Sequence, residues 1–161
     1  MNQASNSIAA IRQCLNEEIA AMTTLAALLK DEQTVLVNSD INLLSEHTLN
    51  KGQLISKISD LEKKRQSVLA DLGFKADAEG MRAYLQAVDA REISAQWENL
   101  LGISSQAKED NRTNGLLINR RLSQNQGALN VLQQNNQSAS LYGPNGQSMV
   151  KKAQGKGVVV R

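Results

Sequence analysis

The strongest constraint on the fold of this chain is a helical spacing of apolar residues that continues, unbroken by proline, from Ile8 to Leu132. The apolar side chains recur at steps of three and four residues, which places them on one face of an α-helix. The single proline, Pro144, follows the whole pattern. Aromatic residues make up only 2% of the chain, whereas strands favour aromatic and β-branched side chains. We therefore expect an all-α fold, an antiparallel helical bundle or coiled coil with one long C-terminal helix.

Interruptions of this spacing predict four helices. Ser5 or Ser7 is able to cap the first helix, and Asp40 is a new N-cap after the segment Asn-Ser-Asp. Gly73 is a suitable C-cap residue for the second helix, and Asp77 caps a short third one. The predicted helices lie near 6–37, 40–72, 77–88 and 91–136, in a single helical domain 1–137 that a flexible tail, 138–161, follows.

The last third of the chain differs from the rest in charge and composition. Residues 1–110 carry eleven basic and sixteen acidic residues, a formal −5, whereas residues 111–161 carry seven basic residues, no acidic residue and fifteen Asn and Gln. This asymmetry favours an acidic or amphipathic partner for the last third, or an intramolecular contact between the acidic and the basic part. Asparagines also enter the apolar stripe of the long helix, where they lower stability and favour one register or partner. The stripe comprises Ile93, Trp97, Leu100 or Leu101, Ile103, Ala107, Asn111, Asn114, Ile118, Leu122, Asn125, Leu129 and Leu132.

The cysteine and histidine content argues against metal or nucleophilic chemistry. With one Cys and one His, the chain has no metal site built from several such residues and no internal disulfide. We expect Cys14 to be buried, His47 to be solvated or to lie at the edge of a helix seam, and Trp97 to anchor the core. A Cys14–His47 nucleophile pair is the weaker alternative. We predict no catalytic residue, no metal and no cofactor.

Two further patterns invite a functional interpretation and are better explained structurally. The acidic pairs Glu17-Glu18 and Glu109-Asp110 are interpreted as solvated helix faces, not as acid–base machinery. Gly155-Lys156 resembles the end of a phosphate-binding loop, but Val150 occupies the position of the first glycine. We therefore expect no small-molecule substrate.

The end of the chain leaves more than one possibility open. The basic segment 151–156 is able to contact nucleic acid or anionic lipid, but it has no aromatic residue for base stacking, so a solubilising tail is favoured. Tyr142 is either a tail residue that packs on the bundle or an exposed anchor for a partner. The chain has no signal-peptide core and no apolar run that spans a bilayer, which predicts a cytoplasmic protein.

Two segments together resemble the FlgN family of flagellar type III export chaperones. One is N-R-T-N-G-L-L-I-N-R-R-L-S-Q-N-Q-G-A-L-N-V-L on the long helix, and the other is L-Y-G-P-N-G-Q after it. The N-terminal half adds L-L-K-D-E-Q-T-V-L, D-I-N-L-L, K-G-Q-L-I-S-K-I-S-D-L-E-K-K-R-Q-S-V-L and the L-G-F turn. The resemblance covers nearly the whole chain, and its specific part is in the last third.

The resemblance implies a small cytoplasmic chaperone without ATPase activity. Its clients would be the C-terminal helical segments of hook-filament junction proteins, the hook-associated proteins 1 and 3, which it would keep from early assembly and carry to the membrane export gate. The family's C-terminal helix binds the client, which here corresponds to the region from Leu116 to Leu132. Tyr142 would contact the gate protein. The client-binding residues are then Asn114, Leu117, Ile118, Arg121, Leu122, Asn125, Leu129 and Leu132, with Arg120 adding charge.

Two other functions stay open from the residues alone. A structural coiled-coil protein would only self-associate, and a homo-oligomer is also compatible with a chaperone. An adaptor for nucleic acid or a membrane surface would use the basic tail, and its binding would fall steeply with salt and be lost on deletion of residues 148–161. A chaperone, which needs no nucleic acid, would bind its client after that deletion.

Overall fold

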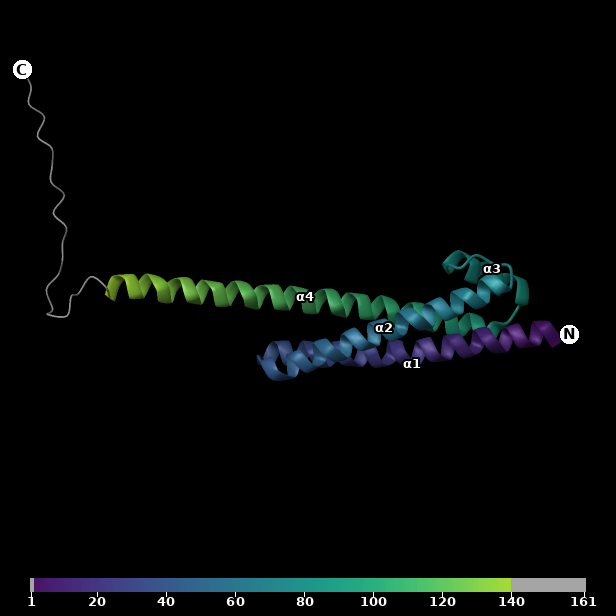
Figure 1. The fold of residues 1–161 in the computed structure, drawn as a ribbon, viewed down its shortest axis with the longest axis horizontal. Coiled ribbons are helices and arrows are strands. Elements are labelled where there is room, and N and C mark those ends of the chain that lie inside the picture. Colours follow the sequence, from purple (N-terminus) through teal and green to yellow (C-terminus); the bar gives the residue numbers. More distant parts are fainter. Residues whose placement is uncertain (1, 140–161) are drawn as a thin grey trace, which may run out of the picture. The chain divides into compact units, whose positions relative to one another are not determined.

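The computed structural model describes the backbone of residues 2–139 and the side chains of residues 6–40 and 42–134. This part of the chain forms four helices, α1 (Asn2–Asn38), α2 (Ile41–Asp71), α3 (Ala78–Val88) and α4 (Arg91–Ala139) (Figure 1). The predicted all-α fold with a long last helix is confirmed. The chain divides into two compact units, Met1–Ile118 and Asn119–Arg161. Because this division lies inside α4, the predicted domain 1–137 spans the first unit and the helical start of the second.

Asp40 and Asp77 are N-caps as predicted, whereas the C-cap of α2 is Leu72 and not the predicted Gly73, which follows it. Asp40 Oδ1 accepts a hydrogen bond from the Leu43 backbone nitrogen at 3.2 Å, and Asp77 Oδ1 accepts one from the Gly80 backbone nitrogen at 2.8 Å. Each bond satisfies an amide that the first turn of a helix leaves unpaired. Gly73 follows the end of α2 with a φ of +83°, which glycine adopts without steric strain.

The helical region extends further at both ends than the sequence predicted. α1 begins at Asn2, so Ser5 and Ser7 lie within the helix and do not cap it. α4 continues to Ala139, three residues past the predicted end at 136. Residues 2–7 and 137–139 contain neither glycine nor proline, so no strong helix breaker stops either helix there. The remainder of the predicted tail, 140–161, lies outside the described residues.

Polar contacts between the helices fix their directions in the first unit. Glu17 pairs with Lys64 at 2.9 Å, whereas Glu32, further along α1, pairs with Lys51 at 2.7 Å, so α1 and α2 are antiparallel. From one contact between α1 and α4 to the next, the residue numbers increase in both helices, so these two helices are parallel. They are the Arg12–Glu92 ion pair at 3.1 Å, the Gln96–Asn16 hydrogen bond at 2.7 Å and the hydrogen bond from Asn114 to the Leu29 carbonyl at 2.8 Å. The short α3 connects α2 to α4 at the end of the bundle where α1 begins (Figure 1).

The apolar core of the first unit has two parts. The larger cluster joins residues of all four helices, namely Ile11, Leu15, Leu69, Met81, Tyr84, Ile93, Trp97 and Leu100. The smaller cluster is Leu25, Leu29 and Ala107, with Leu54 and Ile58 packed against it. Phe74 meets Tyr84 edge-on, with ring centroids 5.5 Å apart, where α3 covers the bundle end. Trp97 and Cys14 are both buried, as the sequence predicted.

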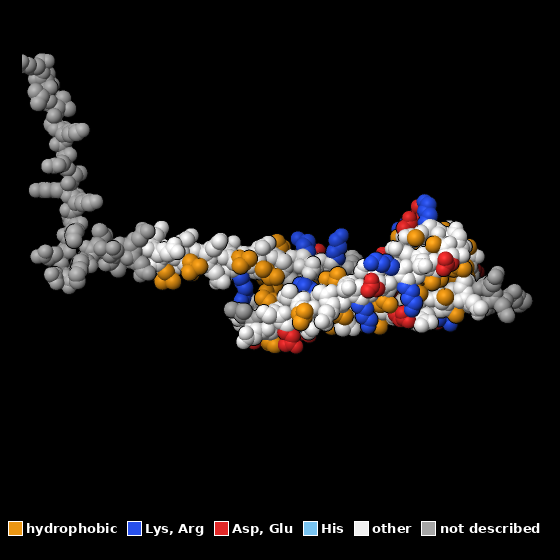
Figure 2. All heavy atoms as spheres, viewed as in Figure 1, with side chains coloured by type: hydrophobic (Ala, Val, Ile, Leu, Met, Phe, Trp, Pro, Cys, Tyr) orange, Lys and Arg blue, Asp and Glu red, His pale blue; other side chains and the backbone are white. Residues whose placement is uncertain are grey.

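Charged side chains of both signs are spread over the visible surface of the first unit (Figure 2). Among the described helices, none contains an apolar stretch long enough to cross a bilayer.

Candidate functional site

One face of α4, here called the α4 seam, carries the candidate site. Its members recur at helical steps along a single face: Ile93, Trp97, Leu100, Ala107, Asn114, Ile118, Leu122, Asn125, Leu129 and Leu132. The first five are buried in the bundle, and Ile118 is half-buried. The steps from Asn114 to Ile118 and from Ile118 to Leu122 are both of four residues. Two such steps in succession break a strict seven-residue repeat. A break of this kind locally unwinds a coiled coil.

The second half of the α4 seam is apolar and exposed. Leu122, Leu129 and Leu132 have exposed fractions of 58%, 56% and 60%. Every described side chain from 122 to 134 is exposed, and Figure 2 shows apolar side chains gathered on the visible face of this helix. Complete burial of a leucine side chain is worth about 1.5–3 kcal/mol, so covering these three would provide substantial binding energy. Exposed apolar residues that share one helix face are a typical surface for a partner helix.

Two other exposed apolar residues on α4 lie on different faces of the helix. Leu116 and Val131 are both more than half exposed. At about 100° per residue they are roughly 140–160° around the helix from Ile118, whereas Leu122 and Leu129 lie within about 40° of it. The α4 seam is therefore the face on which exposed leucines line up.

Asn114 is the buried polar residue of the α4 seam. Its side chain is 1% exposed, and its amide nitrogen donates to the Leu29 carbonyl and to Glu32 Oε2, both at 2.8 Å. The other carboxylate oxygen of Glu32 accepts from Lys51 Nζ at 2.7 Å. Three helices thus meet in one polar layer, in which a buried carboxylate is held by a lysine and an amide. This burial leaves Asn114 facing the bundle and not the solvent.

A second polar layer lies between α1, α2 and α4. Arg65 Nε donates to Glu18 Oε1 at 2.7 Å, and both side chains are buried. The Arg65 guanidinium also lies over the ring of Trp97, 4.8 Å from its centroid, in a cation–π contact. Burial raises the pKa of the Glu18 carboxyl, and the hydrogen bond from Arg65 opposes this shift only in part. The prediction that Glu17-Glu18 is a solvated pair is therefore wrong for Glu18, which faces Arg65 inside the bundle.

Cys14 and His47 lie too far apart to act together. Burial is the main cause that raises the pKa of the Cys14 thiol, and the charges of Lys64 and Glu17 also act on it. Along α2, His47 is about 25 Å from Lys64 at about 1.5 Å per residue. His47 is half-buried, with its Nδ1 2.7 Å from the carbonyl oxygen of Leu43. The alternative of a Cys14–His47 nucleophile pair is contradicted by this geometry.

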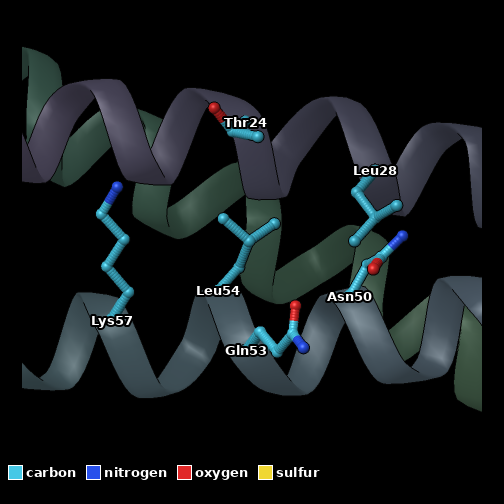
Figure 3. A pocket seen from close by; sticks show the side chains of 6 residues that line it. All are labelled: Thr24, Leu28, Asn50, Gln53, Leu54 and Lys57. Carbon is cyan, nitrogen blue, oxygen red and sulfur yellow. The ribbon is translucent and has the colours of Figure 1, made fainter.

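The hollow between α1 and α2 offers no acid, thiol or imidazole group. A shallow groove of about 400 Å³ between α1 and α2 has Leu28 and Leu54 between the two helices (Figure 3). Its rim is Thr24, Asn50, Gln53 and Lys57, which includes no acid, thiol or imidazole. Within the described residues, no three Asp, Glu, His or Cys side chains are grouped closely enough to hold a metal ion.

The sequence-predicted site residues fall into three environments. Asn114 is buried, and Leu117, Ile118 and Arg121 are half-buried. Leu122, Asn125, Leu129 and Leu132 are exposed, as is Arg120. Tyr142 lies outside the described residues. Sequence reasoning missed Glu32, which accepts from Asn114, and Lys51, which pairs with Glu32. A seam asparagine signals that some partner exists, but only the alignment of the three helices identifies it.

Comparison with known proteins gives a consistent result. The family model described as "FlgN protein" matches residues 1–149. The chain belongs to the FlgN family. Similar FlgN relatives include a "Flagella synthesis protein FlgN" from Proteus mirabilis, 29% identical over 86% of this chain and 89% of its own length. Proteins of the same name from Salmonella typhimurium and Escherichia coli K12 are 26% and 27% identical over 86% of this chain and all of their own length. No solved structure matches the chain.

Proposed function

We propose that this protein is a non-enzymatic, cytoplasmic export chaperone for flagellum assembly. Its FlgN relatives are named flagella synthesis proteins, and membership of their family supports a role in flagellar assembly. The proposed clients are the C-terminal helical segments of the hook-filament junction proteins, hook-associated proteins 1 and 3. The protein would cover these segments until it reaches the membrane protein of the flagellar export gate.

The observation that carries this proposal is the exposed half of the α4 seam. Leu122, Leu129 and Leu132 share one helix face and are each more than half exposed. A segment that polymerises through helix packing must itself carry an apolar face, and a helix-on-helix contact would cover both faces. Leu117 and Ile118, which precede these leucines in the sequence and are half-buried, are further proposed client contacts.

The basic charge of the last third also supports the proposed client helix as the partner. Residues 111–161 contain no acidic residue, and Arg120 and Arg121 lie beside the exposed leucines in the sequence. Arginines at the rim of an interface chiefly raise the association rate with an acidic partner. We therefore expect client association to slow as ionic strength rises, with a smaller effect on dissociation.

Calorimetric titration of the full-length chain with a C-terminal peptide of hook-associated protein 1 or 3 tests the proposal. Leu122→Ala and Leu129→Ala should each weaken binding by about 2 kcal/mol or more, near thirtyfold, because each truncates an anchor. Leu49→Ala is the matched control, since Leu49 is 63% exposed on α2 and lies outside the α4 seam. If both α4 variants bind both peptides as the wild type does, the client site is elsewhere.

In this proposal, binding of the client and its delivery to the export gate depend on different residues and are separable by mutation. Tyr142→Ala should retain client affinity and lose binding to the export-gate protein, measured in the same titration format. Deletion of residues 148–161 should leave client binding nearly unchanged. Loss of binding on that deletion, together with a steep salt dependence, would favour an adaptor that uses the basic tail. A stable oligomer that captures no flagellar protein would favour a self-associating coiled coil.

A further inference from the structure

Asn114 shows what an asparagine in the α4 seam does when a neighbouring helix covers it. Its amide donates to a carbonyl and to the Glu32 carboxylate of α1, both at 2.8 Å, and both Asn114 and Glu32 are buried. Such a layer forms in one alignment of the helices, because a shift by one turn separates donor from acceptor. A single buried asparagine is known to fix register in coiled coils for this reason.

Asn125 occupies the equivalent place in the exposed half of the α4 seam. It follows Asn114 by eleven residues, about three helical turns, which returns it to the same face within roughly 20°. Leu122 precedes it and Leu129 follows it on that face, and all three are exposed. A helix that covers these leucines must also cover Asn125, and burying an amide without a partner costs about 1–3 kcal/mol.

We propose that Asn125 sets the register of the client helix by hydrogen bonding to one acceptor side chain, a carboxylate or carboxamide, within the apolar face of that helix. This inference rests on the proposed function and specifies its ligand. The occupant is an amphipathic helix, because Leu122, Leu129 and Leu132 are exposed and share one face of a helix. A carboxylate is the favoured acceptor, since residues 119–139 contain two arginines and no acidic residue.

The chain offers a matched control in Asn130. It is an exposed asparagine on the same helix, five residues after Asn125. At about 100° per residue it lies roughly 140° around the helix from Asn125, away from the leucines. A change of net charge or helix propensity therefore affects both positions alike, whereas a hydrogen bond inside the client interface exists only at Asn125.

The test is a double-mutant cycle between the full-length chain and synthetic peptides of the C-terminal helical segments of hook-associated proteins 1 and 3. Each Asp, Glu, Asn and Gln on the apolar face of the peptide is replaced by Leu in turn. Binding is titrated to the wild type, Asn125→Leu and Asn130→Leu. At one peptide position we expect a loss of about tenfold with the wild type and Asn130→Leu, and no loss with Asn125→Leu.

A second variant removes the donor without changing the size of the side chain. Where the client acceptor found in the cycle is a carboxylate, Asn125→Asp should weaken peptide binding by about tenfold or more, because two acceptors then face each other, whereas a carboxamide would donate to the new aspartate and retain the contact. Asn130→Asp should change binding by roughly twofold or less in either case. Circular dichroism of each variant confirms that the helix content is unchanged. If the wild type binds a peptide but no position couples to Asn125, the register inference is refuted and the chaperone proposal stands. If neither peptide binds the wild type, both are refuted.

Discussion

Replacing Asn114 by alanine should destabilise the first unit far more than an ordinary helix substitution. The change removes one hydrogen bond to a neutral carbonyl and one to a carboxylate, which contribute about 0.5–1.5 and 1.5–3 kcal/mol respectively. It also leaves Glu32 Oε2, which is buried, without that donor. The higher helix propensity of alanine offsets about 0.5 kcal/mol of this loss. We therefore expect a decrease in the free energy of unfolding of about 2–4 kcal/mol.

Urea denaturation, followed by circular dichroism and by the fluorescence of the single Trp97, measures this decrease. Asn111→Ala is the matched control, because Asn111 is exposed one turn earlier on α4 and should gain only the helix-propensity term. Glu32→Leu with Asn114→Leu should cost less than the sum of the two single changes, since no buried carboxylate then remains. Equal midpoints for Asn114→Ala and Asn111→Ala would refute the buried polar layer.

Two further predictions concern the N-terminal half of the bundle. Gly80→Ala should destabilise by about 1 kcal/mol or more, because a β-carbon there would collide with the Lys75 carbonyl, whereas Gly52→Ala, with open space around it, should stabilise by up to about 1 kcal/mol in the same denaturation assay. The buried Cys14 should react with a thiol reagent only as fast as the bundle opens. Labelling under native conditions at the rate seen in urea would contradict the burial of this thiol. Because the pKa of the Cys14 thiol is raised above the ordinary 9.0 in the folded protein, the free energy of unfolding should decrease as pH rises past that value.

Helix positions in this protein follow from local sequence. Asp40 and Asp77 cap helices as predicted, because a capping side chain acts within three residues of its own position. The predicted outer ends, near 6 and 136, were wrong, because the polar residues between them and the observed ends at Asn2 and Ala139 neither favour nor break a helix strongly. The apolar face that includes Trp97 was equally predictable, because helical periodicity is a property of residues three and four apart.

The sequence by itself therefore determined that the chain is helical, where the helices turn, and that one face of the last helix mixes leucines with asparagines. Only the tertiary structure decided which charged residues are buried. The sequence neighbours of Glu18 and Glu32 do not distinguish them from solvated glutamates, yet they pair with Arg65 and Lys51, which lie 47 and 19 residues further along the chain on the next helix. The structure also decided that the α4 seam is covered at Asn114 and exposed at Leu122, Leu129 and Leu132. Burial depends on the alignment of distant helices, and no spacing within one helix records it.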